Sequence, residues 1–170
     1  MHNVGVAFEV LREGEKAPPG WSKVTGHLVF DMKMDFTRKA RWVLDGHKRP
    51  NPVCSTYVGV VSRESVQIAS TYAALNDLDI MAADIKNAYL NSPCDEKIWT
   101  ILGPELGQEL EGKRALIARS FYGLKSAGAS YCYHLATCMA HLGFESCKAD
   151  PDVWLRENKD HTGASCYEYV

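Results

Sequence analysis

The spacing of apolar residues along the chain predicts two helices. Apolar side chains recur every three or four residues behind Ser62, a suitable N-cap, so a helix is predicted over residues 63–75. The same spacing predicts a second helix over residues 127–142, with Gly143 as its C-terminal stop. The following side chains are expected to face inward from the second helix: Tyr131, Leu135, Cys138, Met139 and Leu142.

Shorter segments predict strands. Residues 24–36 alternate loosely, residues 37–40 form a polar turn and residues 41–44 begin a second strand, which together predict a hairpin with a basic tip. The apolar run at 78–85 is nearly unbroken, as in a strand covered on both faces. This order of elements indicates an α+β fold, with a mostly antiparallel sheet packed on the two helices. Further strands are predicted at 97–102, 115–120, 152–156 and 166–170, the last two joined by a polar turn.

Composition is that of an ordinary globular protein. The 170 residues are 46% hydrophobic and 24% charged, which suffices for one domain with a sizeable core or for part of a larger one. The net charge of −2 neither supports nor excludes nucleic-acid binding, because a basic face can be hidden in a neutral average. The six cysteines include no Cys-x-x-Cys pair, which favours free thiols in a reducing compartment.

The sequence also bears on location. No apolar run reaches the roughly 18 residues of a membrane span, so no membrane partner is expected. Glu9, Glu13 and Glu15 near the N-terminus do not fit a secretion signal. We therefore expect an intracellular protein.

Asp84 is the first candidate for chemistry. It ends the predicted buried strand at 78–85, where a carboxylate is costly unless something neutralises its charge. A divalent metal would do so, since hard cations such as Mg²⁺ prefer carboxylate oxygen. Alternatively, Asp84 caps the following turn through its own backbone. Spacing alone leaves both interpretations open and favours the turn.

Three other groups are weaker candidates. Residues 120–128 join a strand to a helix through Gly123 and Lys125, an arrangement that suits an anion or a nucleotide. Lys39 and Arg41 on the hairpin form a basic pair of a kind that is usually just solvated. The third group lies one helical turn apart but lacks an evident fourth ligand for zinc: His134, Cys138 and His141.

Taken together and in order, three stretches resemble a known family. They are FDMKMDFTRKARWVLDGH, TYVGVVSRESVQIASTYAALNDLDIMAADIKNAYLN and FYGLKSAGASYCYHLATCMAHLGFESCKADPDVW. In this register they are similar to the reverse transcriptase of copia-type LTR retrotransposons, over residues 24–170. The resemblance implies a partial fingers-and-palm polymerase fold, with residues 1–23 as an N-terminal extension or fingers edge. It also implies RNA-directed DNA synthesis by two-metal nucleotidyl transfer.

The resemblance implies roles for individual residues. Asp84 matches the first palm aspartate, a catalytic ligand of Mg²⁺ (or Mn²⁺). Tyr89 matches the aromatic residue that sits under the sugar of the incoming nucleotide and rejects a 2′-hydroxyl. Arg41, and less closely Lys39, match the fingers residues that grip the triphosphate. The remaining matches line the nucleotide and template side of the pocket: Gly123 and Lys125.

Two departures from the family qualify these expectations. Residues 126–128 read Ser-Ala-Gly, where the family usually has Gln, then Ala or Ser, then Pro. The sequence also stops before the family's Tyr-x-Asp-Asp turn, which supplies the other metal carboxylates, and before any thumb or RNase H region. We therefore expect a truncated reverse transcriptase domain that is inactive as this isolated chain.

The implied partners are those of a polymerase inside a retroelement: an RNA or DNA template-primer, a dNTP and the rest of the polyprotein. The alternative is a non-catalytic nucleic-acid-binding or assembly fragment, for which the charge of −2 gives no support. A metal nuclease of RNase H type would need several acidic residues on distinct strands facing one point, and no such set is evident in the sequence.

Overall fold

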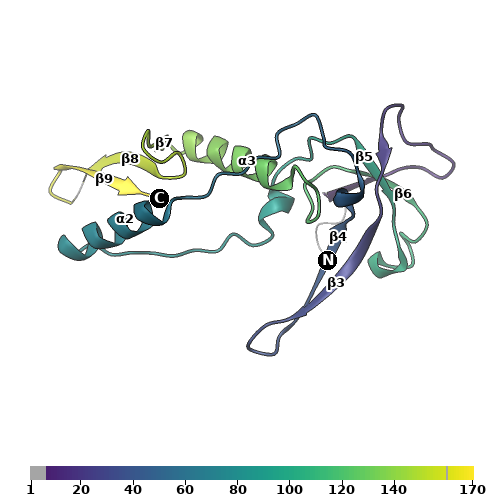
Figure 1. Cartoon of the computed structure of the whole chain (residues 1–170), viewed down its shortest axis with the longest axis horizontal. Coiled ribbons are helices and arrows are strands. Elements are labelled where there is room, and N and C mark those ends of the chain that lie inside the picture. The colour runs from purple at the N-terminus through teal and green to yellow at the C-terminus, as the bar shows by residue number, and fades with distance from the viewer. Residues whose placement is uncertain (1–6, 160) are drawn as a thin grey trace. The chain divides into compact units, whose positions relative to one another are not determined.

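The computed structural model describes residues 7–159 and 161–170 and divides the chain into two compact units (Figure 1). Unit 1 comprises Met1–Tyr57 with Asn87–His134, and unit 2 comprises Val58–Lys86 with Leu135–Val170. The first six residues of the extension predicted at 1–23 lie outside the described part. Helices and mixed, mostly antiparallel sheets confirm the α+β class.

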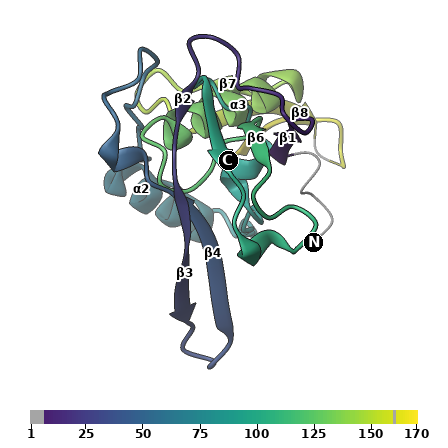
Figure 2. The ribbon, with the colours of Figure 1, turned by 90° about the vertical axis from the view of Figure 1, so that its right-hand side faces the viewer.

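Unit 1 is built on a four-stranded sheet of order β1–β6–β5–β2, antiparallel except for the β2–β5 pair (Figure 2). Both central strands confirm the predicted strands at 97–102 and 115–120, with small shifts of their ends. The edge strands come from the first 23 residues, so that segment takes part in the fold of the unit. The bounds are Phe8–Val10 (β1), Ser22–Lys23 (β2), Ile98–Ile101 (β5) and Arg114–Ile117 (β6).

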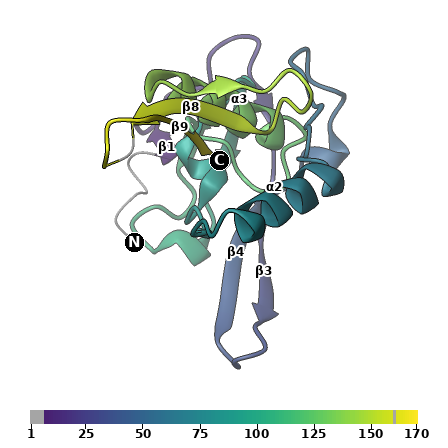
Figure 3. The same ribbon diagram turned by 90° about the vertical axis from the view of Figure 1, so that its left-hand side faces the viewer.

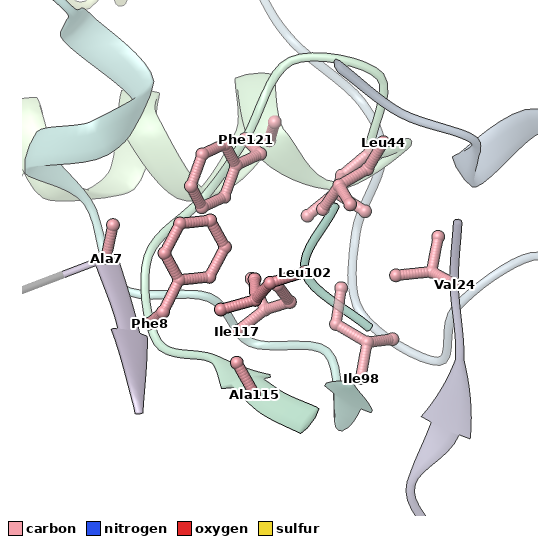
Figure 4. Close-up of a cluster of buried hydrophobic side chains, with 11 residues drawn as sticks. Ala7, Phe8, Val24, Leu44, Ile98, Leu102, Ala115, Ile117 and Phe121 are labelled. Carbon is pink, nitrogen blue, oxygen red and sulfur yellow. The ribbon is translucent and has the colours of Figure 1, made fainter. Parts of the chain in front are cut away.

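The core of unit 1 lies on one face of this sheet (Figure 4). Ile98 and Ile117 are fully buried there. Phe8 stacks on Phe121 with ring centroids 5.0 Å apart, and Trp42 meets both rings edge-on. Aromatic pairs in these geometries contribute about 0.5–1.5 kcal/mol each beyond their buried area. The cluster therefore joins β1, the hairpin and the segment after β6.

The predicted hairpin forms from β3 (Gly26–Met32) and β4 (Arg38–Leu44). Its turn was predicted wrongly at 37–40, because those residues belong mostly to β4. The chain reverses instead at 33–37, where Phe36 has φ +61° and the Asp35 carboxylate accepts a hydrogen bond from the Thr37 N–H at 3.0 Å. This side-chain bond mimics a backbone turn, which a strand-propensity pattern does not register.

Unit 2 contains α2 (Arg63–Leu75) and a three-stranded antiparallel sheet of order β7–β8–β9 (Figure 3). The helix has the predicted bounds, and the Ser62 hydroxyl accepts a hydrogen bond from the Ser65 N–H at 3.0 Å. The hairpin predicted from strands at 152–156 and 166–170 is confirmed with shifted ends. The strands are Glu145–Ser146 (β7), Trp154–Lys159 (β8) and Ser165–Tyr169 (β9).

The second predicted helix is α3 (Ala127–His141), and residues of both units contribute to it. It stops one residue before the predicted end, with Gly143 at φ +84°, as expected of a C-terminal stop. Met139 is buried as predicted, whereas Cys138 and Leu142 are exposed. Leu142 was predicted wrongly because it lies past the last helical turn.

The prediction of a buried strand at 78–85 is wrong. These residues are extended but pair with no described strand, and each of them is exposed. Asp77 with φ +54° ends α2, and the Leu78 N–H donates to the Ala73 oxygen at 2.9 Å. An unbroken apolar run predicts burial only when another element covers it.

Within residues 7–159 and 161–170, no helix is long and apolar enough to cross a membrane.

Replacing Asp150 by Ala is expected to loosen the N-terminus of α2. Its carboxylate accepts hydrogen bonds from the Ser65 hydroxyl at 2.6 Å and from the Ser62 N–H at 2.9 Å. These bonds lower the pKa of Asp150 from 3.8 to about 2. At neutral pH the amides of α2 should exchange hydrogen faster in the variant than in the parent, by hydrogen–deuterium exchange. Asp152→Ala, which removes a neighbouring carboxylate outside this set of bonds, is the matched control.

The pH dependence of the same comparison has a definite sign. Because the pKa of Asp150 is lower in the folded chain, its contribution is complete above about pH 4 and is lost as pH falls through about 2. The difference between parent and Asp150→Ala should shrink over that window. An undiminished difference, or an equal effect of Asp152→Ala, would contradict the prediction.

Candidate nucleotide-binding site

Alternation along β4 decides which way the basic residues of the hairpin point. Trp42 and Leu44 face the core, and the Trp42 indole N–H donates to Glu105 Oε1 at 2.9 Å. Successive side chains of a strand point to opposite faces, so Lys39 and Arg41 share the other face. The anchoring of Trp42 thereby fixes the side on which Arg41 is presented.

Arg41 lies beside an aromatic ring and a carboxylate. Its Cζ is 5.9 Å from the ring centroid of Tyr122, and its Nη1 is 3.5 Å from Asp31 Oδ2. The Arg41 side chain is 32% exposed and that of Asp31 is 56% exposed, so this ion pair contributes little stability. The guanidinium has five N–H donors and is held at the ring with donors available for an anion.

Tyr89 also lies beside Tyr122 and belongs to the short 3₁₀ helix η2 (Ala88–Asn91). This helix follows Asn87, which has a left-handed backbone conformation with φ +54°. The Tyr89 ring centroid lies 4.7 Å from that of Tyr122 and 6.1 Å from that of Tyr131 on α3. We call Tyr89, Tyr122 and Tyr131 the tyrosine cluster. Through Tyr122 it connects Arg41 to Tyr89, so the structure brings together two of the residues that the sequence singled out.

Gly123 holds Tyr122 against β4. It has φ +90°, and a Cβ added to it would overlap the Leu44 carbonyl oxygen and lie 2.7 Å from Val43 Cγ1. The Leu44 N–H donates to the Tyr122 oxygen at 2.9 Å. Only glycine suits both this backbone conformation and this close approach. The predicted importance of Gly123 thus has a local physical basis, the packing of one backbone on another.

Lys125 makes contacts within unit 1. Its Nζ donates to the Arg49 carbonyl oxygen at 2.8 Å and to Asn51 Oδ1 at 3.0 Å. Two of its three donors are therefore engaged in holding the loop after the hairpin. Lys39, in contrast, is exposed on β4, opposite Asp31 in the strand register.

A buried charged group that the sequence did not indicate supports this loop. Glu96 accepts hydrogen bonds from Arg49 Nη1 and from the Ser126 hydroxyl, both at 2.6 Å. The Glu96 and Arg49 side chains are 6% and 18% exposed, so both charges are largely withdrawn from water. Each charge is therefore compensated by the other. Ser126, which departs from the family pattern, thus has a defined partner. Glu96 lies in a polar stretch, where nothing in the pattern indicates burial.

Asp84 belongs to unit 2 and is exposed on the extended segment after α2. Its carboxylate is a suitable oxygen donor for a hard cation. Among the residues that the structure describes, however, no three His, Cys, Asp or Glu side chains come together as a metal-binding group. The described residues therefore do not make a complete metal centre.

Burial raises the pKa of Cys94 to about 12, so this thiol stays protonated at neutral pH and is no nucleophile.

The chain is similar to known proteins over most of its length. Residues 15–162 match the reverse transcriptase (RNA-dependent DNA polymerase) family. The chain is 27% identical over 163 residues to the retrovirus-related Pol polyprotein from transposon TNT 1-94 of Nicotiana tabacum, covering 90% of this chain and 12% of that protein.

Yeast relatives match a shorter region. The transposon Ty1-BL Gag-Pol polyprotein of Saccharomyces cerevisiae is 29% identical over 110 residues, covering 64% of this chain and 6% of that protein. The truncated transposon Ty1-A Gag-Pol polyprotein of the same yeast is 28% identical over 110 residues, covering 64% of this chain and 9% of that protein. The chain thus spans 12% or less of the length of these relatives. No solved structure matches it.

Substituting Gly123 tests how the cluster is held. Gly123→Ala is expected to destabilise unit 1 by about 1–3 kcal/mol more than Gly112→Ala, because the added methyl group meets the Leu44 backbone. Gly112 is the matched control, since it also has a positive φ, +76°, but faces open space. Urea denaturation followed by circular dichroism measures the difference. Equal midpoints for the two variants would mean that the close approach is relaxed at little cost.

Proposed function

Because this chain belongs to the reverse transcriptase (RNA-dependent DNA polymerase) family and is a copia-type reverse transcriptase domain, we propose that it takes part in RNA-directed DNA synthesis by supplying the fingers and part of the palm. The observation that carries this proposal is the contact of Tyr122 with both Arg41 and Tyr89. One ring thereby links a cationic group with an aromatic group. Binding an incoming nucleotide requires both kinds of group.

In this proposal each residue of the site acts on one part of the nucleotide. Arg41 donates hydrogen bonds to the triphosphate through its planar fork, and Lys39, on the same face of β4, adds a second positive charge. The Tyr89 ring lies under the sugar and excludes a 2′-hydroxyl by its bulk. Gly123 lets the pocket wall pack directly on the Leu44 backbone, and Lys125 keeps that wall in place through Arg49 and Asn51.

Asp84 is proposed as one carboxylate ligand of the catalytic ion, Mg²⁺ or Mn²⁺. Two-metal phosphoryl transfer needs carboxylates from separated elements, and the described residues offer no converging set. We therefore assign no reaction step to this polypeptide alone. The residues of unit 1 are instead proposed to bind and orient the nucleotide.

The relatives indicate the setting in which the proposed activity takes place. They are Pol and Gag-Pol polyproteins, so we propose that this domain works beside other parts of such a polyprotein on an RNA or DNA template-primer.

Primer extension tests the function. A polypeptide of these 170 residues is expected not to extend a primer on poly(rA), because the residues that the structure describes bring no metal-binding group together around Asp84. A chimera that carries residues 15–162 in place of the matching segment of the tobacco relative is expected to extend it. Asp84→Asn should lower that activity by roughly 100-fold or more. Full activity of the Asp84→Asn chimera would refute the assignment of Asp84.

Nucleotide binding tests the site on this chain itself. Arg41→Ala is expected to weaken dTTP binding by about 10-fold or more, the loss of charge-assisted hydrogen bonds worth about 1.5–3 kcal/mol. Arg38→Ala is the matched control, because Arg38 carries the same charge on the opposite face of β4. Isothermal titration calorimetry measures both. Equal losses in the two variants would reduce the role of Arg41 to general charge.

A further inference from the structure

The outer face of the four-stranded sheet carries an aromatic residue between two basic ones. Along β5, Ile98 and Thr100 are fully buried, so Trp99 and Ile101 point to the other side. Lys23 Nζ lies 5.7 Å from the Trp99 ring centroid, and Arg114 Cζ lies 6.0 Å from it. The two cations come from β2 and β6, the strands on either side of β5.

A second tryptophan stands next to this group. Trp21 and Trp99 together line a shallow pocket of about 270 Å³. We call the whole set the outer tryptophan face. Its members are Lys16, Ala17, Trp21, Lys23, Trp99 and Arg114.

Core packing does not account for this arrangement. Trp42 shows what a core tryptophan does in this unit, since it packs against Phe8 and Phe121 and bonds to Glu105. Trp21 and Trp99 are half-buried like Trp42, but unlike Trp42 they do not pack against the buried cluster of unit 1.

The nearby acidic groups leave the cations available. Arg114 is fixed by a hydrogen bond from its Nη1 to the Glu15 carbonyl oxygen at 3.0 Å. The Glu15 carboxylate itself accepts the Arg12 N–H at 2.9 Å. Glu9 lies on the same face of the sheet, but on β1, with β6 and β5 between it and β2.

We propose that the outer tryptophan face binds single-stranded nucleic acid, with a base stacked on the accessible part of a half-buried indole and flanking phosphates at Lys23 and Arg114. Every base has a π-face, so this recognition does not depend on sequence. A duplex keeps its bases paired and stacked, which hides those faces. An acidic peptide would use the cations but leave both indoles unused. The site consists of residues other than those of the proposed nucleotide site, so the two proposals are tested independently.

Fluorescence anisotropy of a labelled oligothymidylate with the 170-residue chain tests the proposal. Trp99→Ala is expected to weaken binding at least about fivefold, the lower end for one stacked base, whereas Trp99→Phe retains most of it. The double variant Lys23→Gln with Arg114→Gln should lessen the slope of log affinity against log salt by about 1.4, two phosphate contacts at roughly 0.7 each. If circular dichroism shows that Trp99→Ala is unfolded, the salt dependence of the double variant tests the proposal instead.

Two controls separate this face from the rest of the chain. Tyr57→Ala removes an aromatic residue that is 82% exposed elsewhere in unit 1 and should leave the affinity unchanged. Arg38→Ala, which removes an exposed cation at the start of β4, should also leave it unchanged. Binding that is indifferent to Trp99 and to the double variant, or that is lost with Arg38→Ala instead, overturns the proposal. Equal affinity for polyglutamate, lost in the same variants, would overturn it in favour of an acidic polypeptide.

Discussion

The close approach of Gly123 to the backbone of Leu44 is the constraint on which the candidate site depends. With any other residue at 123 the loop after β6 would stand away from β4, because a Cβ there overlaps the Leu44 oxygen. Tyr122 would then lose its place beside Arg41, and with it the contact that connects Arg41 to Tyr89. A residue without a side chain thus places the one ring that connects Arg41 with Tyr89.

The buried pair of Glu96 and Arg49 holds the same loop from its other end. Ser126, one residue beyond Lys125, donates to Glu96, and Lys125 donates to the Arg49 backbone. A buried ion pair adds little net stability compared with apolar packing, but removing one partner is costly, since the other charge is left without compensation. The pair is thus better understood as fixing the geometry of residues 123–126 than as a source of stability.

The sequence predicted those elements whose signals are local. The first helix was predicted to the residue, because Ser62 caps it and Asn76 with Asp77 ends it through side-chain and backbone bonds nearby. The exposure of residues 78–85 was not predictable from their apolar run, since burial depends on what covers it. Tyr89 was predicted as a site residue only through the family resemblance, whereas Arg41 and Gly123 were also candidates from the sequence pattern itself. Tyr122, Tyr131 and Glu96 were missed because their contacts are made between distant segments, although the aromatic residue directly before Gly123 was a usable signal.

The Asp150 carboxylate that holds the start of α2 also bears on how unit 2 is assembled during synthesis. Ser62 and its acceptor are separated by 88 positions in the chain. A ribosome that adds roughly 5–20 residues per second needs several seconds to make the stretch between them. During that interval α2 has its local serine cap but not its acidic partner, and short helices without tertiary contacts are marginal in water. The order of synthesis thus makes the loop between β7 and β8, which carries Asp150, the last part required to complete the cap of the helix.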